Sequence, residues 1–165
     1  MRVVSCLFTE HNLWLVALAA AVCVSGSAIT FGLFSRARER AGLQKQGWAF
    51  LTAVAAGSSI WCTHFIAMLA YAVTAPVTFD PILTMASLIV AITGCGVGFG
   101  LSAVDERRFV PEVCGAAVGI SVALMHYTGM AAYHVSGLVE WSGDYIAASV
   151  LIGATVSAFA LREAV

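Results

Sequence analysis

Charged side chains are scarce in this chain. Only 10% of its 165 residues are Asp, Glu, Lys or Arg, whereas 61% are hydrophobic and the mean hydropathy is +0.93. No charged residue occurs from 52 to 79 or from 113 to 139. This scarcity excludes a soluble globular domain, because such a domain carries charges over its whole surface.

The sequence also lacks the groupings that mark disulfide scaffolds and enzymes. Its five cysteines include no CxxC pair, and Cys23, Cys62 and Cys95 fall within apolar segments. No paired carboxylates, nucleophile with an adjacent base or phosphate-cradling loop is evident. The glycines at 94, 96, 98 and 100 lie in an apolar segment. A nucleotide-binding fingerprint must follow a strand, and these glycines do not. We therefore expect neither catalytic activity nor a nucleic-acid partner.

The uncharged segments are long enough to cross a lipid bilayer. Apolar runs of about twenty residues are read as transmembrane helices. We predict five spans, at about 11–34, 46–73, 82–103, 113–135 and 145–161. The expected fold class is all-α, a polytopic transmembrane helical bundle over residues 1–165. The stretch after Arg2 has some features of a signal peptide, but the charges from Arg36 to Lys45 are a flank that retains a span.

Basic residues are divided unequally between the two sides of the predicted bundle. Seven lie near 35–45, near 105–112 and at the C-terminal end, whereas the opposite side has only Arg2. That opposite side carries the acidic residues Glu10, Asp80, Glu140 and Asp144. By the positive-inside rule, the N-terminus is outside and the 35–45 loop is cytoplasmic.

The second and fourth predicted spans contain copies of one pattern. Residues 57–73 (GSSIWCTHFIAMLAYAV) align with residues 119–135 (GISVALMHYTGMAAYHV), and seven of the seventeen positions are identical. The identical pairs include His64/His126, Met68/Met130 and Tyr71/Tyr133. The odd spans carry a weaker echo, in which Phe31-Gly32-Leu33 recurs at 99–101 and as Phe159-Ala160-Leu161. The repeating unit is therefore a two-helix hairpin, with two complete units and the first helix of a third.

All four histidines fall in the outer half of the predicted membrane or at its edge. His64 and His126 lie about 13 Å deep, at 1.5 Å per helical residue. Met68 and Met130 each follow their histidine by four positions, so each His and Met pair shares one helix face. Small residues, Gly57, Ser59, Gly119, Ser121 and Gly129, allow the two helices to approach closely.

Two imidazoles and two thioethers in a small volume form a soft ligand set. Thioethers suit Cu(I), and imidazole serves both oxidation states of copper. Zinc is more often held by Cys, His and carboxylate, and magnesium and calcium need oxygen ligands. The alternative for a single pair is structural, because an intramembrane His often packs as a helix contact and Met fills space. The repeat and the cost of a polar group in lipid favour a copper site.

Three further residues have weaker claims to this site. Met125 precedes His126 but lies 100° around the helix, and its counterpart in the second span is Thr63. His11, at the start of the first span, is placed to reach the site. His134 has Ala72 opposite it and is interpreted as an interfacial residue.

The stretch MHYTGM at 125–130 is the signature of the bacterial MHYT domain, and the whole chain resembles that family. The segment IWCTHFIAMLA at 60–70 is a looser copy of the motif. The resemblance implies a sensor module of about six spans in the bacterial inner (plasma) membrane, with three copies of the motif near the outer face. It also implies a copper site formed by His64, Met68, His126, Met130 and Met125. Two departures are Thr63, which replaces the motif Met in the first copy, and the missing third copy.

The leading hypothesis is therefore a copper-binding sensory module that detects a diatomic gas (dioxygen, carbon monoxide or nitric oxide) or a redox state. The family often joins such a module to a cytoplasmic output domain, such as a diguanylate cyclase or phosphodiesterase, for cyclic di-GMP signalling. The sequence is also compatible with a homodimer. Two alternatives remain open: a non-covalent haem held by histidine or His/Met, and a transporter or channel for a metal or protons.

Overall fold

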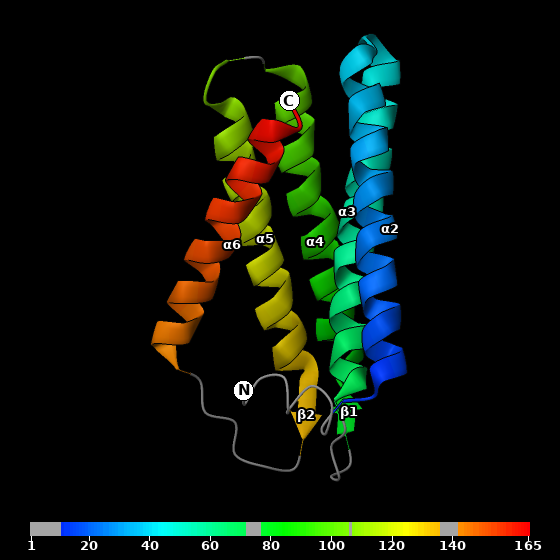
Figure 1. Cartoon of the computed structure of the whole chain (residues 1–165), viewed down its shortest axis with the longest axis vertical. Helices are drawn as coiled ribbons and strands as arrows, with labels where there is room; N and C mark the ends of the chain where they lie inside the picture. The colour runs from blue at the N-terminus through cyan, green and yellow to red at the C-terminus, as the bar shows by residue number, and fades with distance from the viewer. Residues whose placement is uncertain (1–10, 72–76, 106, 136–141) are drawn as a thin grey trace.

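The computed structural model describes residues 11–71, 77–105, 107–135 and 142–165. Within these residues, five long helices run side by side: α2 (Leu13–Glu39), α3 (Gly42–Ala70), α4 (Pro81–Val104), α5 (Val110–Ala132) and α6 (Gly143–Glu163) (Figure 1). Two short strands, β1 (Val77–Phe79) and β2 (Tyr133–Val135), lie at one end. All five helices are long and apolar enough to span a membrane. The expected all-α transmembrane bundle is confirmed.

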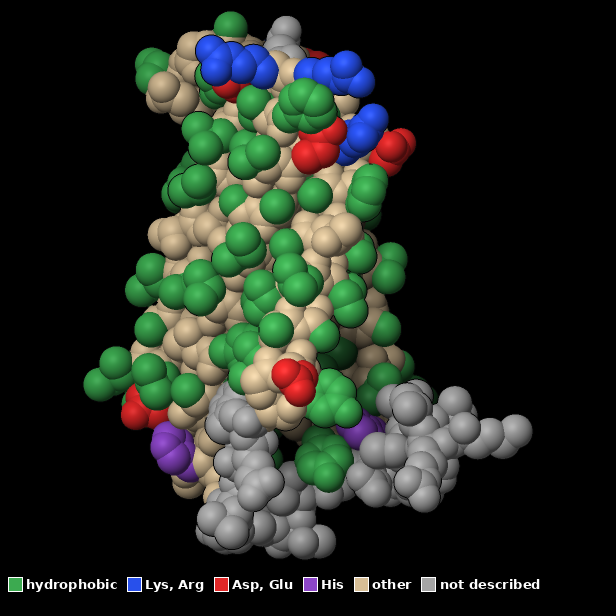
Figure 2. Space-filling view, turned by 90° about the vertical axis from the view of Figure 1, so that its left-hand side faces the viewer, with side chains coloured by type: hydrophobic (Ala, Val, Ile, Leu, Met, Phe, Trp, Pro, Cys, Tyr) green, Lys and Arg blue, Asp and Glu red, His purple; other side chains and the backbone are tan. Residues whose placement is uncertain are grey.

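The two ends of the bundle differ in charge. Lys and Arg side chains gather at the end away from the strands, which we call the basic end, and hydrophobic side chains cover the length between (Figure 2). The end that carries β1 and β2 is called the strand end. At the basic end, Arg162 pairs with Glu112 at 3.5 Å, and Lys45 donates from Nζ to the Ala103 carbonyl at 3.0 Å. Three charges used to predict orientation, Arg2, Glu10 and Glu140, lie outside the described residues.

Each helix packs mainly against its neighbours in the sequence, so the five form a row. Lipid tails are as apolar as the helices, and membrane helices therefore associate by close packing at small residues. A Cβ atom added at Gly57 of α3 would lie 2.6 Å from the backbone nitrogen of Ile92 in α4. A Cβ at Gly119 of α5 would lie 2.7 Å from Cα of Ala154 in α6. Both glycines are thus points of backbone contact.

These contacts repeat with a constant offset. Gly57 and Gly119 are 62 positions apart, and so are Ile92 and Ala154, which they contact. The caps at the strand end repeat as well, with acceptors 62 positions apart and donors 68 positions apart. The amide of Asn12 donates to the Ala70 carbonyl at 2.7 Å, and that of Asp80 donates to the Ala132 carbonyl at 2.8 Å. The two-helix repeat predicted from the sequence is therefore also a repeat of packing.

The packing corrects one part of the sequence alignment. Phe159 was aligned with Phe99, which is an offset of 60, but the contacts of α4 and α6 repeat at 62 and place Leu161 at the position of Phe99. Leu161 is 3% exposed and Phe99 is 7% exposed, whereas Phe159 is 59% exposed. A three-letter match between apolar helices is too short to fix a register, whereas the glycine contacts fix it.

The ends of the predicted spans also need correction. The spans predicted at 46–73 and 113–135 run past the ends of α3 and α5, which stop at Ala70 and Ala132. The strands pair antiparallel, with Val77 opposite Val135, and a separate bridge joins His11 to Tyr71. Three-residue strands are too short to show an alternating pattern. At the basic end the helices extend past the apolar runs, as α2 does to Glu39, because a helix continues into its charged flank. Residues Ala72, Val73 and Trp141 lie outside the described residues.

The close approach at Gly57 makes a testable prediction about stability. We expect Gly57→Ala to destabilise the bundle by about 1–3 kcal/mol, because the methyl group meets fixed backbone atoms of α4. Gly100→Ala is the matched control, since a Cβ there has nothing within 4 Å. Unfolding in detergent, followed by circular dichroism against denaturant, measures both. Equal stabilities of the two variants would contradict the assigned contact.

Candidate functional site

The rings of His64 and His126 meet between α3 and α5. Their Nδ1 atoms are 3.3 Å apart, and the ring centroids are 4.8 Å apart with an interplanar angle of 68°. Both α3 and α5 pack against α4 and also contact each other, so the two histidine-bearing helices are held close together. The convergence of the two histidines, predicted from the sequence repeat, is present in the structure.

The His64 ring reaches α5 because of Gly129. A Cβ atom at Gly129 would lie 2.7 Å from Nε2 and 3.1 Å from Cδ2 of His64. Gly129 is buried, whereas its counterpart in the first repeat, Ala67, is exposed. The two copies of the motif are therefore not equivalent. Only the second copy provides space for the ring of the other, and this explains the glycine of the MHYTGM stretch.

Two buried polar atoms beside the pair have no hydrogen-bond partner among the described residues. They are Nε2 of His64 and Oγ1 of Thr63. Other hydroxyls in these helices bond back to the previous turn, as Ser121 does to Ala117 at 2.8 Å and Thr128 does to Leu124 at 2.7 Å. Buried polar atoms are nearly always satisfied, so such exceptions need an explanation, and a bound ligand or ion is one.

A cavity of about 350 Å³ is lined by these two residues, and we call it the histidine chamber. His64, His126, Thr63 and Met125 line it, together with small residues of α5 and α6. Met125 is only 1% exposed, so its thioether is held inside the protein. The sequence gave Met125 a weaker claim because of its angle around the helix, yet it is the methionine that shares the chamber with both histidines.

Met68 and Met130 lie together, but in a different cavity. They line a space of about 320 Å³ nearer the strand end, with Tyr71, Tyr133 and Val135. Neither methionine is among the residues that line the histidine chamber. The expected cluster of two imidazoles and two thioethers is thus divided into a His64, His126 and Met125 group and a Met68 and Met130 group. The i+4 spacing places each Met on the same helix face as its histidine, but one turn nearer the strand end.

The remaining two histidines lie at the strand end. The His11 ring contacts Tyr71 with centroids 5.2 Å apart, as Phe79 contacts Tyr133 at 5.4 Å in the next repeat. His11 does not line the histidine chamber, and its contact with Tyr71 repeats a purely aromatic one. His134 is exposed in β2 opposite Thr78, and its Nδ1 lies 3.1 Å from the Ala132 carbonyl.

The geometry of the histidine pair fits a shared metal ion. A first-row ion such as zinc binds each imidazole nitrogen at about 2.0–2.1 Å, so two nitrogens on one ion are at most about 4.2 Å apart. The 3.3 Å separation of the two Nδ1 atoms is within this limit. Among the described residues, no group of three or more His, Cys, Asp or Glu side chains lies together. Further protein ligands from these residues would therefore be soft or neutral, as the Met125 thioether is.

The site also has a link to α6 that sequence reasoning missed. The Tyr127 hydroxyl lies 2.6 Å from Oγ of Ser149 in α6, and Tyr127 directly follows His126. The sequence predicted that Gly129 allows close approach of the two helices, but it did not reveal the recess for the His64 ring or the contact of Tyr127 with α6. Gly129 and Tyr127 are within the quoted motif, so the motif itself was the available signal.

A known protein family matches the chain twice, with the same spacing as the two-helix repeat. The family described as "Bacterial signalling protein N terminal repeat" (MHYT) matches residues 57–116 and 119–165, two copies that begin 62 positions apart. A signalling protein of Caulobacter vibrioides is 36% identical over 152 residues, which cover 92% of this chain and 19% of that protein.

Two Pseudomonas aeruginosa proteins are also similar to the chain. The bifunctional diguanylate cyclase/cyclic di-GMP phosphodiesterase MucR is 30% identical over 94% of the chain and 23% of its own length. The cyclic di-GMP phosphodiesterase NbdA is 34% identical over 68% of the chain and 15% of its own length. The chain thus spans less than a quarter of these relatives. No solved structure matches it significantly.

A duplicated histidine-bearing hairpin, the matches to both of its copies and the shared similarity to signalling proteins have one explanation: the chain belongs to the MHYT family of bacterial signalling proteins.

Proposed function

We propose that this chain is a copper-binding sensory module of the bacterial inner membrane, without catalytic activity of its own. The observation that carries the proposal is the contact of His64 with His126, at 3.3 Å between Nδ1 atoms. Copper would be held by these two imidazoles and by the buried thioether of Met125. Met68, Met130 and His11 would become copper ligands only after a rearrangement. The two methionines line a separate cavity near the strand end, and the His11 ring packs against Tyr71.

Bound copper would give the membrane a centre that takes up a diatomic gas or changes oxidation state. The chain's own residues supply the rest of the site. Gly129 leaves room for the His64 ring, and the Thr63 hydroxyl adds a polar group to the chamber wall. The half-buried position of the pair keeps it out of bulk water.

The arrangement is less suited to haem. Two axial imidazoles bind haem iron from opposite faces of the macrocycle, so the ring plane must lie between them. The two histidines are in direct contact, and no plane of that size separates them. A continuous polar path for ions is also not supported, since the residues that line the cavity between the chamber and the basic end are apolar or carry hydroxyls.

Copper binding is tested by metal analysis of purified protein. We expect His64→Ala and His126→Ala each to lose copper, and Gly129→Ala to weaken binding because its methyl group displaces the His64 ring. His134→Ala and Gly100→Ala are matched controls at positions away from the chamber and should retain copper. Copper content after dialysis against a Cu(I) chelator is the readout. If all five variants bind like the wild type, the histidine pair is no copper site.

The membrane orientation follows from charge. We propose that the strand end faces the outside and the basic end the cytoplasm, because Lys and Arg in short loops are retained inside. The test uses a chain whose five native cysteines are replaced by alanine, with Ser142→Cys at the strand end or Leu43→Cys at the basic end. Both positions are exposed. On intact cells a membrane-impermeant maleimide should label only Ser142→Cys, and the reverse pattern would overturn the orientation.

The similarity to MucR and NbdA suggests what the module controls. We propose that it precedes a cytoplasmic output domain that makes or degrades cyclic di-GMP. The signal would pass through α6, which packs mainly against α5 and is hydrogen-bonded to it by Tyr127 and Ser149 near the site. A change at His126 would move Tyr127, and α6 would carry the shift to the basic end.

This path predicts an effect of Tyr127→Phe. Spin labels at Leu18→Cys and Leu151→Cys, both exposed, report the distance between α2 and α6 by double electron–electron resonance. We expect carbon monoxide to change that distance in the Cu(I)-loaded protein and Tyr127→Phe to suppress the change while copper is retained. Tyr145→Phe, at an exposed site in α6, is the control. An unaltered response in Tyr127→Phe would show that the signal takes another path.

A further inference from the structure

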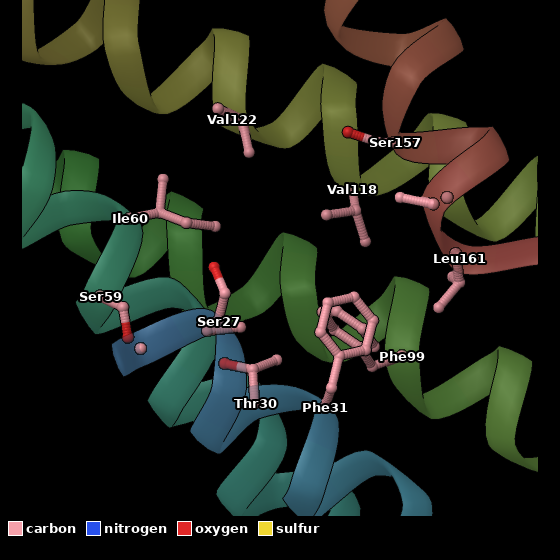
Figure 3. Close-up of a pocket in the computed structure, with 14 residues that line it drawn as sticks. Ser27, Thr30, Phe31, Ser59, Ile60, Phe99, Val118, Val122, Ser157 and Leu161 are labelled. Atoms are coloured by element: carbon pink, nitrogen blue, oxygen red, sulfur yellow. The ribbon is translucent and has the colours of Figure 1, made fainter. Parts of the chain in front are cut away.

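A third cavity lies between the helices nearer the middle of the bundle. Its volume is about 220 Å³, and residues of all five helices line it. Figure 3 shows Ser27, Thr30 and Phe31 of α2 on one side, with Ser157 and Leu161 of α6 across from them. Among the described residues, the lining contains no Asp, Glu, Lys, Arg or His. We call this space the central cavity.

The central cavity opens toward the lipid between α2 and α6. These two helices are joined at the basic end, where Arg38 donates to the Val165 carbonyl at 2.6 Å. From there α6 diverges from the other helices toward the strand end (Figure 1). Ser27, Phe31 and Ala160 line the cavity and are also exposed, so they mark its mouth. In a membrane this mouth faces acyl chains.

The central cavity adjoins the histidine chamber. Ile60 and Val122 line both spaces, and they are the only two residues the two linings share. Each lies four positions, or one helical turn, before its histidine. They are also repeat partners, 62 positions apart. Their side chains lie at the same end of the central cavity in Figure 3, opposite Leu161. This apolar pair therefore lies at the junction of the central cavity and the histidine chamber.

We propose that the central cavity is the access route by which a small apolar solute of the diatomic-gas class passes from the bilayer to the histidine pair. Ile60 and Val122 are its constriction and set the size of solute that passes. This inference rests on the proposed gas-sensing function and adds the direction from which the gas arrives, the membrane interior rather than the water at the strand end.

Physical chemistry favours this route. Apolar solutes leave water for an apolar phase, so a neutral diatomic gas is more concentrated among acyl chains than in the aqueous phase. Apolar cavities in proteins stay dry and take up apolar guests such as xenon. Ions and metal chelators find no charged group among the described residues of this lining.

The cavity is tested first in metal-free protein with xenon as the probe. In the wild type, xenon should shift the methyl resonances of Val118 and Val122. Ala160→Phe, which places a ring at the mouth, should abolish these shifts. Ala148→Phe is the matched control, because Ala148 is exposed on the same helix and lines neither space. If the methyl resonances of the wild-type protein do not respond to xenon, the proposal is overturned. This is the result expected if lipid fills the cavity.

The route is tested by carbon monoxide rebinding to Cu(I)-loaded protein after flash photolysis. We expect Ala160→Phe to slow rebinding several-fold, and Ile60→Ala combined with Val122→Ala to accelerate it several-fold, with Ala148→Phe unchanged. Rates that are equal in all variants would overturn the route and leave the copper site standing. If the protein binds neither copper nor carbon monoxide, the proposed function is overturned, and the route with it. Persisting xenon shifts would then show that the cavity itself is present and that the failure lies in the proposed function.

Discussion

Close contact of helix backbones at small residues is the constraint on which the rest of this structure depends. In lipid no hydrophobic force drives helices together, so they pack where side chains are absent. Gly57 of α3, packed against α4, and Gly119 of α5, packed against α6, fix the position of each histidine-bearing helix along the helix that follows it. The two contacts are 62 positions apart, as the histidines are, so each histidine lies at the same distance along its helix from the glycine contact. Gly129, beside the His64 ring, then leaves the space in which the two rings meet.

The sequence predicted the large features because they depend on composition. Long uncharged runs identify spans, and a repeat with a His, a Met and a Tyr in register identifies two equivalent helices. The end of each span was harder, because β1, β2 and the His11–Tyr71 bridge are too short to leave a pattern. The Phe159 alignment failed for a related reason, since three apolar letters match by chance in an apolar helix, whereas Leu161 occupies the buried place.

The ligand set shows a different limit of sequence reasoning. Spacing of four residues places Met68 and Met130 on the histidine face, and the structure agrees, but a shared face is several turns long. Depth along that face decides which side chains meet. Met125 is next to His126 in sequence and lies 100° around the helix from it. Its side chain nevertheless lines the histidine chamber, as His126 does. Contact across helices cannot be read from one helix alone.

The difference between Gly129 and its repeat counterpart Ala67 has a consequence for the symmetry of the histidine pair. Two copies of a duplicated hairpin begin as interchangeable, and a ligand shared by them would be held symmetrically. Here one imidazole leans into a recess on the opposing helix, while its twin has no such recess because Ala67 is exposed. The two imidazole rings therefore have different surroundings, although they stand at equivalent positions of the repeat. After the duplication, one hairpin came to supply the recess and the other the ring that fills it.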